Sequence, residues 1–148
     1  MKRVLSVLLC MVFLLGFIPV FASASSADDN RTATSVGGSN TRMSYINCAA
    51  ASIGISGGKV ISVGDLEGYK GITTKVEITL TIQRRASASN LWSDWYNYPK
   101  QTFNSHRGTA SCSKDAVKGY QYRTKADFVA WAGSSYEAVT VYSGYVSY

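Results

Sequence analysis

The chain has 148 residues, a formal net charge of +6 and a nearly even balance of apolar and polar residues. This length allows one domain with a substantial core but not two. The basic residues are scattered, with Arg84-Arg85 the only adjacent pair after the N-terminal Lys2-Arg3. Because no basic stripe is present, the charge does not indicate a nucleic-acid partner.

Residues 1–24 have the three parts of a secretory signal. Lys2 and Arg3 precede an apolar run at positions 4–18, and Pro19 and Ala22-Ser23-Ala24 follow it. This order predicts cleavage between Ala24 and Ser25. A retained membrane anchor is the alternative, because the run is close to the shortest that spans a bilayer. We therefore expect a secreted protein, extracellular or associated with the cell wall.

Cleavage would remove Lys2, Arg3 and Cys10, which leaves a formal charge of about +4. Cys48 and Cys112 would then be the only cysteines, and an oxidising compartment favours a single disulfide between them. Closing a loop of this length stabilises a protein by about 4 kcal/mol in the chain-entropy model. Two buried free thiols are the alternative.

The mature chain divides at residue 42. Residues 25–41 are small, polar and unpatterned, which predicts a flexible leader. Residues 42–148 carry runs of β-branched and aromatic residues with period two. This second part is predicted to be the folded domain.

The expected strands are separated by glycine-containing turns. In chain order they cover 43–56, 59–66, 74–85, 91–98, 109–113, 119–131 and 136–142, with Phe103 in an additional short segment. The alternation is clearest at 74–85, where Val76, Ile78, Leu80 and Ile82 share one face, and at 119–131. Such alternation indicates strands with one buried and one solvated face.

About seven short strands without a helical period predict an all-β fold: a single immunoglobulin/fibronectin-like antiparallel β-sandwich. A small barrel is the alternative. Tyr120 and Tyr122, at the start of a late strand, are placed for a tyrosine-corner hydrogen bond. Cys48 and Cys112 do not occupy the positions of the usual immunoglobulin disulfide, so the likeness concerns architecture only.

Several segments also resemble a known family. They are Tyr45-Ile46, the stretches 53–59 and 73–84, the pair Trp92/Trp95, and the stretches 118–123 and 135–140. Together they resemble a family of small secreted β-sandwich proteins of Gram-positive bacteria, classed as a domain of unknown function. The resemblance spans roughly residues 45–143. It implies the fold and secretion, and it supplies no activity and no functional residues.

Catalytic and metal-binding patterns are weak. His106 is the only histidine, and a hydrolase would require Asp94 or Asp115 to orient it beside a serine. No serine lies in a nucleophile-elbow motif, and no cysteine, histidine or carboxylate spacing fits zinc or calcium. The sequence therefore predicts no enzyme, no catalytic residue, no metal and no cofactor.

The clearest binding pattern is aromatic. The segment 91–98 contains Trp92, Trp95, Tyr96 and Tyr98, and period two predicts Trp92, Tyr96 and Tyr98 on one face and Trp95 on the other, unless a bulge intervenes. Exposed rings in a row would stack on sugars or clamp a peptide. Rings that fill the core are the alternative. Trp131 is a second candidate, and the tyrosine-rich tail 142–148 either extends a strand or docks on a partner.

These patterns favour a secreted, non-catalytic binding or surface-interaction module of unknown ligand. Its partner would be a cell-surface glycan or protein, with no nucleic acid and no stable membrane insertion after cleavage, and the chain is expected to be a monomer. The first alternative is a bacteriocin-like secreted antagonist of other bacteria, which growth inhibition by the purified protein would reveal. The second alternative is a hydrolase that uses His106.

Overall fold

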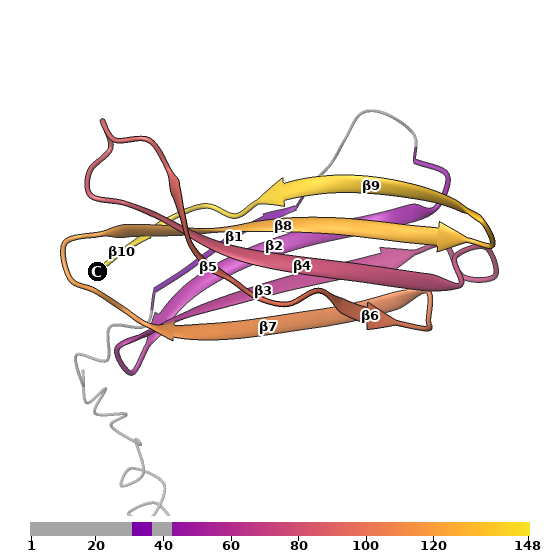
Figure 1. The fold of residues 1–148 in the computed structure, drawn as a ribbon, viewed down its shortest axis with the longest axis horizontal. Helices are drawn as coiled ribbons and strands as arrows, with labels where there is room; N and C mark the ends of the chain where they lie inside the picture. The colour runs from indigo at the N-terminus through magenta and orange to yellow at the C-terminus, as the bar shows by residue number, and fades with distance from the viewer. Residues whose placement is uncertain (1–30, 37–42) are drawn as a thin grey trace, which may run out of the picture.

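The computed structural model describes residues 31–36 and 43–148, and these form two antiparallel β-sheets packed face to face. Figure 1 shows the strands running along the long axis of the molecule, with turns and loops gathered at its two ends. No helix among the described residues is long and apolar enough to cross a membrane. The predicted signal at residues 1–24 lies outside the described residues.

The first sheet has the order β1-β2-β3-β7. Its strands are β1 (Arg31–Val36), β2 (Ile46–Ser56), β3 (Lys59–Gly68) and β7 (Arg107–Asp115). Gly57 and Gly58 both have positive φ, which permits the tight turn from β2 to β3. The turn leaves β2 and β3 paired from Ser56↔Lys59 onward.

The second sheet is built around β4 (Lys75–Arg85) and β8 (Gln121–Ala132), which pair over their whole common length. On the far side of β4 lie β5 (Ser93–Asn97) and β6 (Gln101–Phe103). On the far side of β8 lie β9 (Ser135–Tyr142) and β10 (Val146–Ser147). The C-terminal tail thus extends the edge begun by β9, which is one of its two predicted roles, and docking of the tail on a partner stays a prediction.

The predicted all-β sandwich is confirmed. Strands β2, β3 and β7 lie in one sheet, and β4, β8 and β9 lie in the other. Immunoglobulin-like sandwiches divide their strands between the sheets in the same way. The main difference lies at the N-terminus, because residues 31–36 of the expected leader form β1. The segment has no long apolar run, but its backbone groups pair with β2 over six positions. Backbone pairing, which a hydropathy pattern does not register, accounts for this strand.

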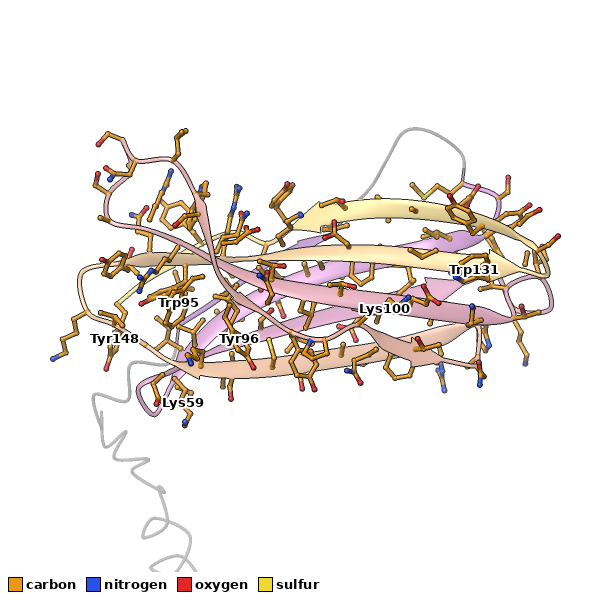
Figure 2. The ribbon with its side chains drawn as sticks, in the orientation of Figure 1. Lys59, Trp95, Tyr96, Lys100, Trp131 and Tyr148 are labelled. Carbon is orange, nitrogen blue, oxygen red and sulfur yellow. The ribbon has the colours of Figure 1, made fainter. Side chains whose placement is uncertain are left out.

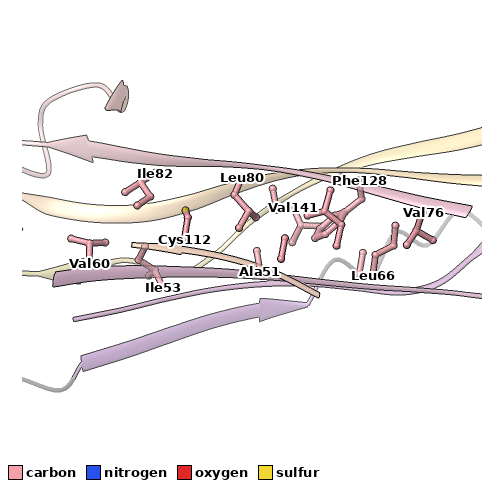
Figure 3. Close-up of a cluster of buried hydrophobic side chains, with 14 of the residues drawn as sticks. Ala51, Ile53, Val60, Leu66, Val76, Leu80, Ile82, Cys112, Phe128 and Val141 are labelled. Atoms are coloured by element: carbon pink, nitrogen blue, oxygen red, sulfur yellow. The ribbon is translucent and has the colours of Figure 1, made fainter. Parts of the chain in front are cut away.

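The core fills the space between the two sheets. The alternating residues predicted to face inward on 74–85 are all buried, as are Tyr122, Thr124, Ala126, Phe128 and Ala130 on β8. Figure 3 shows side chains of both sheets meeting in this layer, with Phe128 and Leu80 from the second sheet close to its centre. Gly64 on β3 makes room for them, because an added Cβ there would lie 2.8 Å from Leu80 Cδ2. The absent side chain therefore sets how closely the sheets approach.

The predicted tyrosine corner is present and uses Tyr122. Its hydroxyl donates to the Val117 carbonyl and accepts from the Val117 N–H, both at 2.8 Å. Burial raises the pKa of Tyr122 above its ordinary value, although the bond to Val117 and the charge of Arg84 oppose this. The phenol therefore stays neutral and fastens the β7–β8 connection to the start of β8.

Glu137 on β9 joins the two sheets at the opposite end. Its carboxylate accepts backbone N–H groups from Ser44, Tyr45 and Ile46 at 2.7, 2.7 and 3.3 Å, at the point where β2 begins. Desolvation alone would raise the pKa of Glu137, but these three donors outweigh it and lower the pKa below 4.5. The ionised carboxylate is thus the form that the fold prefers.

Glu137→Gln is expected to lower the free energy of unfolding by about 1–3 kcal/mol at pH 7, because it weakens charged hydrogen bonds to three N–H groups. The lowered pKa means that the carboxylate contributes fully above pH 4.5 and that its contribution is lost as the pH falls below that value. Urea unfolding at pH 7 and pH 3 measures this. The control is Asp115→Asn, whose exposed carboxylate binds only Lys59. An equal stability difference at both pH values would contradict the role of the charge.

The predicted disulfide between Cys48 and Cys112 is wrong, because both thiols are free. Cys48 pairs with Glu67 of β3 on one side, whereas Cys112 pairs with Ser62 on the other side. The two β3 partners are five positions apart, which is roughly 17 Å along a strand. A disulfide requires Cα atoms within about 7 Å.

The two thiols should therefore differ in reactivity. Cys48 is exposed, while Cys112 is buried and burial raises its pKa, against a hydrogen bond with Ser62. We expect one equivalent of thiol reagent to react with residues 25–148 under native conditions and a second only after unfolding. Mass spectrometry of the labelled protein identifies the site. A dithiothreitol-dependent shift of the urea midpoint would instead indicate a disulfide.

Candidate functional site

The aromatic segment 91–98 does not present the predicted row of rings. A β-bulge interrupts the pairing of β4 with β5, because Ile82 pairs with Tyr96 while Gln83 pairs with Asp94. The extra residue, Trp95, therefore turns to the same side as Tyr96. Trp95, Tyr96 and Tyr98 are all partly buried and pack against the core.

Trp95 and Tyr96 lie at one end of the sandwich (Figure 2). The Trp95 ring is 5.3 Å from that of Tyr122, and the Arg84 guanidinium is 5.0 Å from its centroid. Lys114 of β7 lies 5.4 Å from the Tyr96 ring. These contacts close the end of the core, so for these rings the core-filling alternative describes the structure.

Trp92 instead lies on the outer face of the second sheet, within a set of alternating rings and guanidinium groups. We call this set the arginine–aromatic ladder, and its members in order are Tyr142, Arg123, Trp92, Arg85 and Tyr145. The Arg123 carbon Cζ is 4.4 Å from the Tyr142 centroid and 4.6 Å from that of Trp92. The Arg85 Cζ is 4.4 Å from the Trp92 centroid and 5.4 Å from that of Tyr145.

Neutral amides hold both guanidinium groups in place. Arg123 Nε donates to Gln83 Oε1 at 2.8 Å, and Gln83 Nε2 donates to Asp94 Oδ1 at 2.7 Å. Arg85 Nε donates to Gln121 Oε1 at 2.8 Å. The alternation of β4 and β8 aims these side chains outward, since Gln83 pairs with Arg123 and Arg85 with Gln121. The ladder is therefore fixed by two neighbouring strands and not by a loop alone.

No ion pair among the described residues neutralises the positive charge of the ladder. Elsewhere on this sheet Lys125 pairs with Asp127, and Glu77 binds both Lys75 and Lys100. Within the described ranges, Arg85 and Arg123 have no carboxylate oxygen within 4.0 Å. Partial burial and the nearby charge of Arg85 lower the pKa of Arg123, although Tyr142 opposes this. An arginine remains protonated at neutral pH all the same.

This arrangement suits the binding of an oxyanion. A guanidinium that lies over a ring uses its face, so the N–H groups at its edge stay available for carboxylate or phosphate oxygens. The same contacts cover part of the Trp92 ring and reduce the area left for stacking on a sugar. The predicted stacking role of Trp92 is therefore less well supported than a role in orienting Arg85 and Arg123.

Trp131, the second aromatic candidate, lies at the opposite end of the molecule (Figure 2). Lys75 Nζ is 4.2 Å from its centroid, and the Tyr136 ring is 4.9 Å away. Lys75 also forms an ion pair with Glu77, a carboxylate that it shares with Lys100, so its positive charge is partly balanced. Its chemistry is thus less distinctive than that of the ladder.

The conditions set for a hydrolase are not met by the geometry. Arg107–Asp115 is one continuous strand, so His106, just before its start, and Asp115, at its end, are roughly 30 Å apart. Asp94 pairs with Gln83 of β4. Phe103, which is close to His106 in sequence, pairs with Val76, seven positions from Gln83 on the same strand, so Asp94 and His106 lie far apart along β4. Neither acid can orient the imidazole. No group of three or more candidate metal ligands occurs in the portion that the structure describes.

A shallow concavity of about 440 Å³ lies on the other sheet, between the start of β7 and the end of β3. Its lining includes Cys48, Asp65, Glu67 and Arg107. The Asp65 carboxylate accepts from the Thr109 hydroxyl at 2.6 Å. The mixed charges of this concavity select no particular class of ligand.

Comparison of the chain with protein-family models, curated proteins and solved structures gave no significant match. The resemblance to a family of secreted Gram-positive proteins therefore stays a prediction. Any proposal about function must depend on the geometry described above.

Proposed function

We propose that the chain is a secreted, non-catalytic binding module and that its ligand contacts the arginine–aromatic ladder. One observation carries the proposal. Aromatic rings and glutamine side-chain amides, and not carboxylates, contact the guanidinium groups of Arg85 and Arg123. An anionic group that bound here would meet two oriented cations, neither of which has a carboxylate oxygen within 4.0 Å among the described residues. A partner on the cell surface, reached after export, fits the predicted signal at residues 1–24.

The ladder also has the composition of binding hot spots. Tryptophan, tyrosine and arginine are the residue types that most often dominate interface energies. Tyr142 and Tyr145 are 42% and 54% exposed, so a partner that covers them would gain apolar contact beside the two cations. The pairing of β4 with β8 gives the site a rigid base, which limits the entropy lost on binding.

Arg85→Gln and Arg123→Gln are each expected to weaken binding at least tenfold, because each removes one charged, oriented donor set. The measurement is retention of residues 25–148 on isolated bacterial cell envelopes and on a glycan array, with urea unfolding to confirm that each variant is folded. Lys125→Gln is the matched control, since Lys125 lies on the same face but is paired with Asp127. No retention of the parent protein on either surface would reject the proposal, as would an equal loss in the control.

A further inference from the structure

We infer that the end of the sandwich next to the ladder docks on an anionic phospholipid surface. This inference rests on the proposed binding function and names its partner. The end is formed by the β2–β3 turn, the β4–β5 loop, the β7–β8 connection and the C-terminal segment, which Figure 1 shows together on one side of the molecule. Hydrogen bonds join the β7–β8 connection to two of these segments, since Ala116 N donates to Gly58 O and Gly119 N to Tyr148 O.

Charge is distributed unequally between the two ends. Among the side chains that the structure describes, the end beside the ladder carries six basic ones, and its acidic ones are Asp94 and Asp115. The six are Lys59, Arg84, Arg85, Lys114, Lys118 and Arg123. The other half balances Lys70, Lys75, Lys100 and Arg107 against Asp65, Glu67, Glu77 and Glu137. A negatively charged surface would therefore attract the molecule with the ladder end foremost.

The same end presents apolar side chains to solvent. Leu91, in the β4–β5 loop, is 92% exposed, and Val117, in the β7–β8 connection, is 43% exposed. Leu91 directly precedes the aromatic Trp92 in sequence, and Val117 directly precedes the basic Lys118. An exposed leucine at the tip of a loop gains free energy when it enters an apolar phase.

The apolar, aromatic and basic side chains of this end fit the successive layers of a bilayer surface. Leu91 and Val117 would enter the boundary of the acyl chains, Trp92 and Tyr145 would lie at headgroup level, and Arg85 and Lys118 would bind phosphates. A soluble anionic polysaccharide would use the arginines but would offer nothing to Leu91 and Val117. The apolar tips thus favour a lipid surface over a glycan.

Sedimentation of residues 25–148 with vesicles tests the inference. The apolar run at 4–18 is removed because it would bind lipid by itself, and a cooperative urea transition first confirms that the shortened chain is folded. We expect binding to equimolar phosphatidylglycerol and phosphatidylcholine vesicles and at least tenfold weaker binding to phosphatidylcholine alone. Leu91→Ser combined with Val117→Ser should reduce binding at least tenfold, as should Arg85→Gln combined with Lys118→Gln.

Matched controls lie at the opposite end. Ile72 is 50% exposed and belongs to the β3–β4 loop beside Lys70, so Ile72→Ser combined with Lys70→Gln should leave vesicle binding unchanged. An equal loss in this control would overturn the inference. A different pattern would assign the site to a glycan: the variant with Arg85→Gln and Lys118→Gln loses binding, the variant with Leu91→Ser and Val117→Ser keeps it, and a soluble anionic polysaccharide competes. Retention on cell envelopes without vesicle binding would reject the lipid surface and leave the binding function standing.

Discussion

Phe128→Ala is expected to lower the free energy of unfolding by about 3–5 kcal/mol, the usual cost of emptying a buried aromatic site. Phe128 is 1% exposed and lies on β8, the strand that pairs with β4 on one side and with β9 on the other. Its ring fills the space over Gly64, where an added Cβ would be 3.3 Å away. Because Gly64 has no side chain to move, the cavity cannot be filled from β3.

Urea unfolding at pH 7, followed by tryptophan fluorescence, measures the loss as a lower midpoint with an unchanged m value. Val129→Ala is the control, since Val129 is the next residue on β8 and faces outward. We expect it to cost less than about 1 kcal/mol. Similar losses for the two variants would mean that β8 has a different register against the core.

Thr124→Val is expected to cost about 2–3 kcal/mol although the two side chains have nearly the same shape. The Thr124 hydroxyl donates to Ser52 O at 2.8 Å, so the Ser62 hydroxyl, also at 2.8 Å, must donate to Thr124. These bonds cross from the second sheet to β2 and β3 in the first. Valine would leave a carbonyl and a hydroxyl without a partner in the core, at about 1–3 kcal/mol for each group.

The double variant Ser62→Ala/Thr124→Val tests this account. Removing both hydroxyls leaves fewer unpaired groups than removing Thr124 Oγ1 alone, so the double variant should lose about 1 kcal/mol less than the sum of the single losses. Additive losses in urea unfolding would show that the hydrogen bond between Ser62 and Thr124 contributes nothing beyond packing.

The proposed binding site is only partly predictable from sequence. The sequence marks the aromatic segment 91–98 as unusual, and it shows Arg84-Arg85 as the only adjacent basic pair of residues 25–148. Their combination with Arg123, Tyr142 and Tyr145 was missed, because these residues meet only through the pairing of β4 with β8 and of β8 with β9. The alternation that places Arg123 outward was a usable signal, since Gln83 and Arg85 face outward on the neighbouring strand.

The period-two pattern by itself determined most of the fold, because a strand with one buried face must alternate. It determined the inward sides of β4 and β8, while the glycine-containing segments between the runs marked the turns. Only the tertiary structure decided that Arg31–Val36 forms β1 and that Cys48 and Cys112 lie on opposite sides of β3. It also decided the bulge at Trp95, which puts Trp95 instead of Trp92 on the same side as Tyr96. Each of these depends on which backbones become neighbours, and a local pattern carries no information about partners distant in the chain.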